Sequence, residues 1–192
     1  MLYLTLGLIV LACVQRLYRT TALRARLIKR YGLNSSVVGL CALCIAGVGL
    51  LVFGKSTAHY ATLWLPPAGL QLFVLPLMFV GFVIAAAEFV PSNFYRWLQR
   101  PLMWGGLVWL SAHLLVKGDQ ASVILFGGLA VLVILEIWTP RVTLGKSCSR
   151  EKIPWMKESL TVAAGGSAFL VMFALHSSIF GVPPTMMGHA FF

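Results

Sequence analysis

The stretch PLMWGGLVWLSAHLLVKGDQASVILFGGLAVLVILEIW, residues 101 to 138, decides the fold. It contains two apolar runs, 101 to 116 and 121 to 138, separated only by the polar turn KGDQ. A helix that crosses a bilayer needs about 20 apolar residues, and in lipid the backbone finds its hydrogen-bond partners only within such a helix. The stretch therefore predicts two consecutive transmembrane helices.

Four further apolar runs lie outside this stretch, at about residues 2 to 17, 36 to 53, 68 to 90 and 159 to 180. The whole chain is 59% hydrophobic and only 10% charged, too little charge to cover the surface of a water-soluble domain. We expect an all-α, polytopic membrane helix bundle of about six transmembrane helices, forming one integral membrane domain over residues 1 to 192. The lipid bilayer is then its first partner.

The first run is short enough to be compared with a signal peptide. Signal peptides carry Lys or Arg before the apolar core, whereas here the cations Arg16 and Arg19 follow it. Both side chains are long enough to reach the membrane surface from within the helix. The charge order therefore favours a transmembrane helix.

Lys and Arg alternate between the loops of this six-helix arrangement. Thirteen of the fifteen lie in the first, third and fifth loops, and only Lys55 and Lys117 lie on the other side. Cytoplasmic loops hold the excess of Lys and Arg, so we expect both termini on the non-cytoplasmic side. Because the net charge of +10 is explained by topology and no basic, aromatic surface is evident, we expect no nucleic-acid partner.

The first basic loop, TTALRARLIKRYG at residues 20 to 32, has apolar residues at helical spacing with cations between them. Two interpretations stay open. The segment lies on the anionic surface of the membrane, or its cations only hold the loop on the cytoplasmic side.

Four ionisable side chains fall within the predicted membrane helices, where their cost in free energy marks them as functional candidates. Glu88 and Glu136 lie near helix ends, where Arg96 or Arg141 is available for pairing. His113 and His176 lie at similar depth near the non-cytoplasmic face. Such a pair of imidazoles suits the binding of haem iron, proton transfer or hydrogen bonding between helices. The residues alone do not distinguish among these three roles.

Small and sulfur-containing residues give weaker signals. The glycine pairs at 105 and 106, 127 and 128, and 165 and 166 indicate close helix packing. Cys41 and Cys44 share a helix face, but no second ligand pair accompanies them, so we expect no metal site. No catalytic constellation is visible, and the catalytic residues are unknown.

The region from residue 100 to residue 135 resembles the NnrU family of bacterial membrane proteins. Members typically read H-P-M, then W-G, L-W-x-x-A-H-L-L-x-x-G-D and L-L-F-G-G. The segments 23 to 27 and 175 to 184 resemble the family's basic stretch and its closing L-H-x-x-x-F-G-V-x-P, so the likeness covers nearly the whole chain. The matching residues of the central motif are Pro101, Met103, Trp104, Gly105, Trp109, Ala112, His113, Gly118, Asp119, Phe126, Gly127 and Gly128.

The resemblance implies a protein of the bacterial inner membrane, with periplasmic termini, that acts as an accessory factor in nitrite and nitric oxide reduction or in assembly of a membrane complex. The family is also similar to the plant zeta-carotene isomerase, which uses haem b, so the alternative is a haem-dependent isomerase-like enzyme acting on a polyene. The haem ligand proposed in that relative corresponds to His113. Two other family histidines are absent, one of them replaced by Arg100, so a second ligand must be a residue such as His176.

Overall fold

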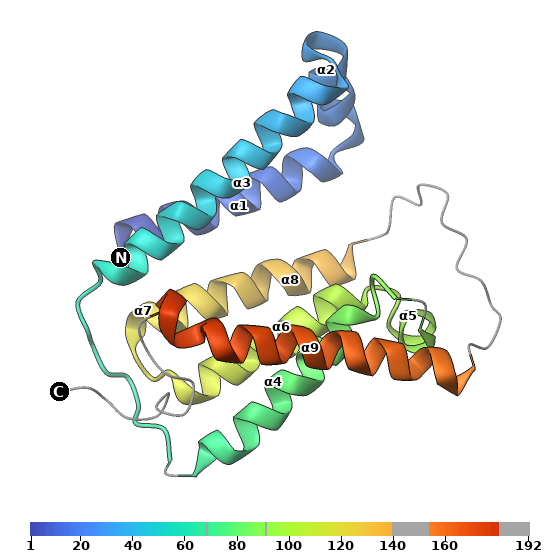
Figure 1. The fold of residues 1–192 in the computed structure, drawn as a ribbon. Helices are drawn as coiled ribbons and strands as arrows, with labels where there is room; N and C mark the ends of the chain where they lie inside the picture. The colour runs from blue at the N-terminus through green and yellow to red at the C-terminus, as the bar shows by residue number, and fades with distance from the viewer. Residues whose placement is uncertain (68, 91, 140–153, 181–192) are drawn as a thin grey trace. The chain divides into compact units, whose positions relative to one another are not determined.

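The protein is described here by a computed structural model that covers residues 1–67, 69–90, 92–139 and 154–180. Helices dominate these residues, with one isolated β-bridge between Thr62 and Asp119 (Figure 1). The elements, in chain order, are α1 (Leu2–Arg19), α2 (Thr21–Tyr31), α3 (Leu33–Ser56), α4 (Leu70–Ala86), α5 (Asn93–Leu98), α6 (Pro101–Val116), α7 (Gln120–Ser122), the π-helix η1 (Val123–Gly127), α8 (Gly128–Trp138) and α9 (Trp155–Phe180).

The predicted fold class is confirmed. In the described part of the chain, α1, α3, the continuous segment Gln120–Trp138 and α9 are each long and apolar enough to cross a membrane. The two remaining apolar helices, α4 and α6, have 17 and 16 residues. All six apolar runs are thus helical, and α6 has the same bounds as the run that predicted it.

The chain divides into two compact units, which are described separately. Unit 1 consists of residues 1–62 and 119–129, and unit 2 of residues 63–118 and 130–192. The organisation of the chain as one integral membrane domain stays a prediction.

Unit 1 is built on a hairpin of α1 and α3 whose interface is lined by glycine. A Cβ atom at Gly7 would lie 2.9 Å from the Gly47 carbonyl oxygen, and one at Gly54 would lie 2.7 Å from the Leu4 nitrogen. Leu4 is completely buried at this contact, and the rings of Tyr3 and Phe53 meet edge to face at 5.1 Å. Because glycine has no side chain, the backbones of α1 and α3 come close together at these contacts.

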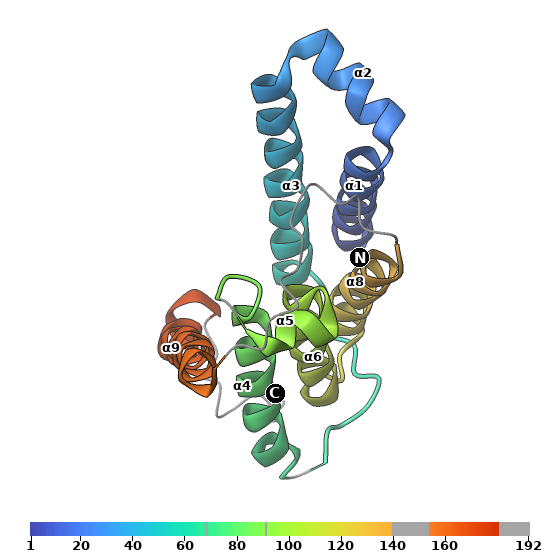
Figure 2. The same ribbon diagram turned by 90° about the vertical axis from the view of Figure 1, so that its right-hand side faces the viewer.

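Two breaks in the helical backbone set α2 apart from its neighbours. Thr20, between α1 and α2, is extended, and Gly32, between α2 and α3, has a φ of 81°. Positive φ is readily accessible to glycine because it lacks a Cβ atom. As a result α2 crosses from the end of α1 to the start of α3 (Figure 2).

Unit 2 places α4 between α6 and α9 (Figure 2). Close approach is again made at glycines: a Cβ at Gly105 would lie 2.6 Å from the Ala85 nitrogen, and one at Gly165 would lie 2.5 Å from the Val83 Cα. The core between these helices is apolar. Its buried members are Val74, Met78, Ala112 and Val116, with Leu70, Leu77, Trp109 and Phe169 packed against them.

The three glycine pairs expected to serve helix packing each use one glycine. Gly105 and Gly165 face the backbone of a neighbouring helix so closely that a methyl group would not fit, and Gly128 faces the end of the Leu8 side chain. Their partners Gly106 and Gly127 have no such neighbour within 4 Å. The prediction of close packing is therefore confirmed, and the structure shows which glycine of each pair makes the contact.

Gly105→Ala and Gly106→Ala form a matched test of this packing. We expect Gly105→Ala to cost about 1–3 kcal/mol, because the new methyl group must push α4 and α6 apart. Gly106→Ala should leave stability unchanged or raise it slightly, because Ala favours a helix over Gly by up to about 1 kcal/mol. The measurement is the thermal unfolding midpoint of each variant in detergent, and equal midpoints would contradict the contact.

Candidate functional site

The candidate site centres on His113, one turn before the end of α6. Pro101 occupies the start of this helix, where the missing N–H of proline has no cost. Ala112, beside His113, is completely buried in the core of unit 2, and His113 itself is only 6% exposed. The imidazole is thus held inside the helix bundle rather than directed to lipid.

A hydrogen bond to the backbone fixes the ring of His113. Its Nδ1 lies 3.0 Å from the carbonyl oxygen of Trp109, and the two rings pack with their centroids 4.2 Å apart. A carbonyl oxygen only accepts, so Nδ1 must carry the proton and donate it. In the neutral ring, Nε2 then keeps its lone pair, which leaves it able to accept a hydrogen bond or bind a metal ion.

His176 of α9 is the second predicted site residue. It is half-buried and lies on α9, which packs against α4. His113 and His176 thus lie on α6 and α9, the helices on either side of α4, and their pairing stays a prediction. Their role as ligands stays a prediction.

The turn after His113 is fixed within unit 2 by Gly118. Its carbonyl oxygen accepts hydrogen bonds from the backbone nitrogens of Leu63 at 2.7 Å and Trp64 at 3.2 Å. A Cβ atom at this position would collide with the carbonyl group of Trp64. This contact explains why glycine occupies position 118, because only glycine lets the two backbone segments approach so closely.

Asp119, the next residue, is the centre of a polar network in unit 1. It is 4% exposed, and its carboxylate accepts hydrogen bonds from Ser122 N at 3.0 Å and from Ser122 Oγ at 2.6 Å. It also forms an ion pair with Lys55 Nζ, which donates to Ser122 Oγ at 2.8 Å as well. The network joins the end of α3 to the start of the helical segment 120–138.

Two opposing effects act on the Asp119 carboxyl. Burial by itself raises the pKa, but the hydrogen bonds from Lys55 and Ser122 outweigh it and hold the pKa of Asp119 below its usual value. The sequence marked Lys55 as a loop residue and Asp119 as part of the family motif, but not their contact. The available signal for the role of Asp119 was its position just before the apolar run 121 to 138, because Asp is a preferred N-cap residue.

Asp119→Asn tests this network, because the amide keeps the shape of the side chain but not its charge. We expect a loss of about 1–3 kcal/mol at pH 7 from the ion pair and its charged hydrogen bonds. A lowered pKa stabilises the fold fully above the usual Asp pKa, and this contribution is lost as the pH falls below about 4 toward the folded-state pKa.

The unfolding midpoints of the wild type and Asp119→Asn should therefore differ by a constant amount from pH 8 to pH 5 and converge in more acidic buffer. Gln120→Ala, at the neighbouring exposed position, is the control and should show no such pH dependence. A difference that is unchanged at pH 3 would rule out the ion pair as its source.

Glu136 pairs with a cation other than the two considered in the sequence. Arg100 forms an ion pair with its carboxylate at 3.5 Å and donates hydrogen bonds to the carbonyl oxygens of Glu136 and, at 2.9 Å, Thr139. These carbonyls lie at the end of α8, where a cation is favourable. Arg141 and the side chain of Arg96 lie outside what the structure describes, so pairing with them stays a prediction. At the other carboxylate, Glu88 Oε2 lies 3.5 Å from the backbone nitrogen of Leu102 at the start of α6.

A third polar contact, not foreseen from the sequence, involves Glu158 in the first turn of α9. Its carboxylate accepts hydrogen bonds from the buried Ser92 Oγ at 2.7 Å and from the Asn93 nitrogen at 2.8 Å. Ser92 in turn accepts one from the Phe94 nitrogen at 3.1 Å. This arrangement fixes the start of α5 against α9 by satisfying N–H groups that have no partner within the helix.

The cysteines give little support for a metal site. Cys13 and Cys41 are exposed, Cys44 is half-buried, and all three are free thiols, while Cys148 lies outside the described residues. Among the described residues, no group of three or more His, Cys, Asp and Glu side chains is placed to hold a metal ion.

The fold and these polar contacts define a multi-pass helical membrane protein with a buried histidine near the end of one helix. The sequence model of the NnrU protein family matches residues 3–184, nearly the whole chain. The chain belongs to the NnrU family. No curated protein and no solved structure matches it.

Proposed function

We propose that this protein is an accessory factor of the bacterial inner membrane that supports nitrite and nitric oxide reduction or the assembly of a membrane complex serving it. The family match over residues 3–184 supports this proposal, because the resemblance to this family implies an association with that respiration. The central motif adds support: Gly118 and Asp119 stabilise turns and helix ends. Such contacts suit a scaffold that presents a fixed surface to a membrane partner.

A deletion strain tests this function. We expect the strain to consume nitrite and nitric oxide more slowly under oxygen limitation and to recover when the wild-type gene is supplied. His113→Ala should fail to restore the rates at normal membrane abundance, while Ser111→Ala, two residues away in α6, should restore them. Wild-type rates in the deletion strain would overturn the accessory role, and full activity of His113→Ala would remove His113 from the site.

The geometry at His113 favours a second candidate, a haem-dependent isomerase-like enzyme acting on a lipophilic polyene such as a carotenoid. Metal-binding histidines commonly donate the other ring N–H to a carbonyl group, as His113 does to Trp109. The donor chemistry would therefore suit haem iron held by His113 Nε2, with His176 as the second ligand. Bound haem b would supply the iron centre at which a double bond is isomerised.

In this second candidate the protein orients the ligand and excludes water. The Trp109 carbonyl fixes the His113 ring, and the apolar side chains around Ala112 and Val116 keep water from it. The two candidates differ in the absorption spectrum of the purified protein. A Soret band that is lost in both His113→Gln and His113→Ala supports the enzyme, since glutamine is not a usual haem ligand, and a featureless visible spectrum supports the accessory factor.

We also propose that both termini are periplasmic, on the basis of the Lys and Arg distribution. An alkaline phosphatase reporter, which is active only outside the cytoplasm, should be active when fused after Phe192 and inactive when fused at Gly145. The opposite pattern would reverse the orientation, and activity at both positions would change the number of membrane crossings.

A further inference from the structure

The helix α2 is placed where a membrane surface must lie. It connects α1 and α3, two helices long enough to cross a bilayer, and these pack as an antiparallel hairpin. The end of α1 and the start of α3 therefore emerge on the same side of the membrane. With Thr20 and Gly32 breaking the helices on either side, α2 runs across these two ends (Figure 2). It therefore lies at the level of the lipid headgroups.

One face of α2 is exposed and strongly basic. Arg26, Lys29 and Arg30 are spaced as i, i+3 and i+4, which brings them onto one side of the helix, and all three are exposed. The half-buried residues, Leu27 and Ile28 among them, lie toward the opposite side. The helix is thus amphipathic, with Arg26, Lys29 and Arg30 directed away from the hairpin, while its fourth cation, Arg24, is half-buried.

These cations are far from the acidic side chain of their own unit. Residues 1–62 contain no Asp or Glu, and the single carboxylate within 119–129 is Asp119. Asp119 pairs with Lys55, which lies about 33 Å along α3 from Leu33. This separation is about three Debye lengths or more at physiological salt, so Asp119 does not neutralise the basic face.

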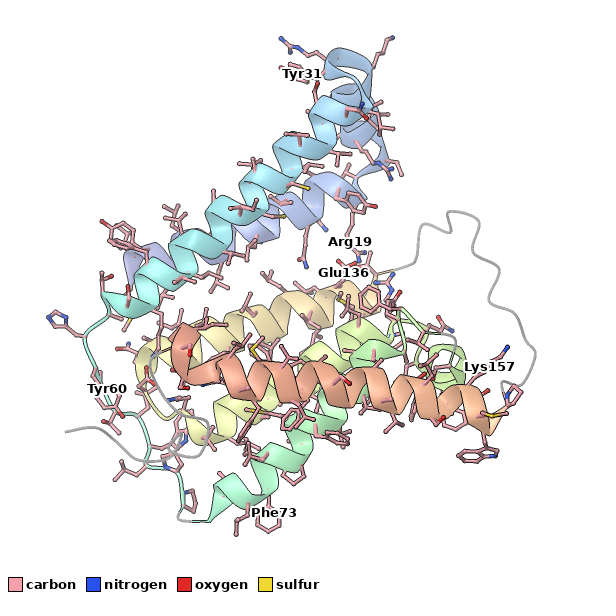
Figure 3. The ribbon with its side chains drawn as sticks, viewed as in Figure 1. Arg19, Tyr31, Tyr60, Phe73, Glu136 and Lys157 are labelled. Carbon is pink, nitrogen blue, oxygen red and sulfur yellow. The ribbon has the colours of Figure 1, made fainter. Side chains whose placement is uncertain are left out.

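Aromatic side chains flank the basic residues at this end of the hairpin. The Arg24 guanidinium lies 5.1 Å from the centre of the Tyr18 ring, and that of Arg30 lies 5.4 Å from the Tyr31 ring. Both tyrosines are more than half exposed, and Figure 3 shows Tyr31 at the tip of the hairpin. Exposed tyrosine is typical of the membrane interface, where its polar tip reaches water and its ring contacts lipid.

From the exposed basic face of α2 and its position at the ends of α1 and α3, we infer that α2 binds the phosphate headgroups of anionic phospholipids in the adjoining leaflet. The charges are complementary, and Arg26 and Arg30 are each able to hold a phosphate through two N–H groups. Of the two interpretations that the sequence left open, the structure favours the surface-bound helix. This binding is independent of any role in nitrogen-oxide reduction.

The experiment measures lipid binding to the full-length protein in detergent by native mass spectrometry. The probes are phosphatidylglycerol, phosphatidylcholine as the zwitterionic lipid, and inorganic phosphate as the free anion. We expect phosphatidylglycerol to bind the wild type about tenfold or more tightly than phosphatidylcholine, since each cation near an anionic surface contributes appreciably. Equal affinity for the two lipids, or competition by millimolar inorganic phosphate, would overturn the assignment to a lipid headgroup.

The triple variant Arg26→Gln, Lys29→Gln, Arg30→Gln should lose most of this preference. The matched control Lys146→Gln, Arg150→Gln, Lys152→Gln removes the same charge elsewhere and should keep it. If both variants lose it equally, the effect belongs to net charge and the site on α2 is wrong. Should the triple variant not fold, Lys29→Glu alone must still weaken phosphatidylglycerol binding, and unchanged binding by that variant overturns the proposal.

Discussion

Close backbone contact at glycine is the interaction on which both units of this protein depend. Lipid chains are as apolar as the side chains they would replace, so helices in a bilayer gain little from hydrophobic burial and associate through tight packing instead. Gly7 and Gly54 serve this purpose between α1 and α3, and Gly105 and Gly165 do so for α4 with α6 and α9. The interior positions of His113 and Leu4 follow from these contacts.

Polar side chains work mainly at the ends of the helices, where backbone groups lack partners. The Asp119 carboxylate satisfies the N–H group of Ser122 at the start of the segment 120–138, and Arg100 satisfies carbonyl groups at the end of α8. Arg100 occupies the position at which the resemblance implies a histidine in other family members. The guanidinium at that position is committed to the end of α8 and to Glu136, so the position has a structural use here.

His113 differs from these groups because it lies within a helix and its Nε2 is not the atom that bonds to Trp109. A buried imidazole in a membrane helix is costly, which makes His113 a candidate for a functional residue. The basic face of α2 lies in the other unit. The chain therefore carries two features with different chemistry, the buried His113 in unit 2 and the exposed cationic face of α2 in unit 1.

The sequence alone determined the fold class, the positions of the six apolar helices and the family motif, because the length and apolar character of each run depend on local composition. It also singled out His113 and His176. Only the tertiary structure decided which glycine of each pair makes a contact, that Glu136 pairs with Arg100, and that Lys55, Asp119 and Ser122 form one network. Such contacts join residues far apart in the chain. Which residues meet depends on how each helix is rotated about its axis when it packs. A helix that is apolar on every side has no apolar periodicity that would specify this rotation.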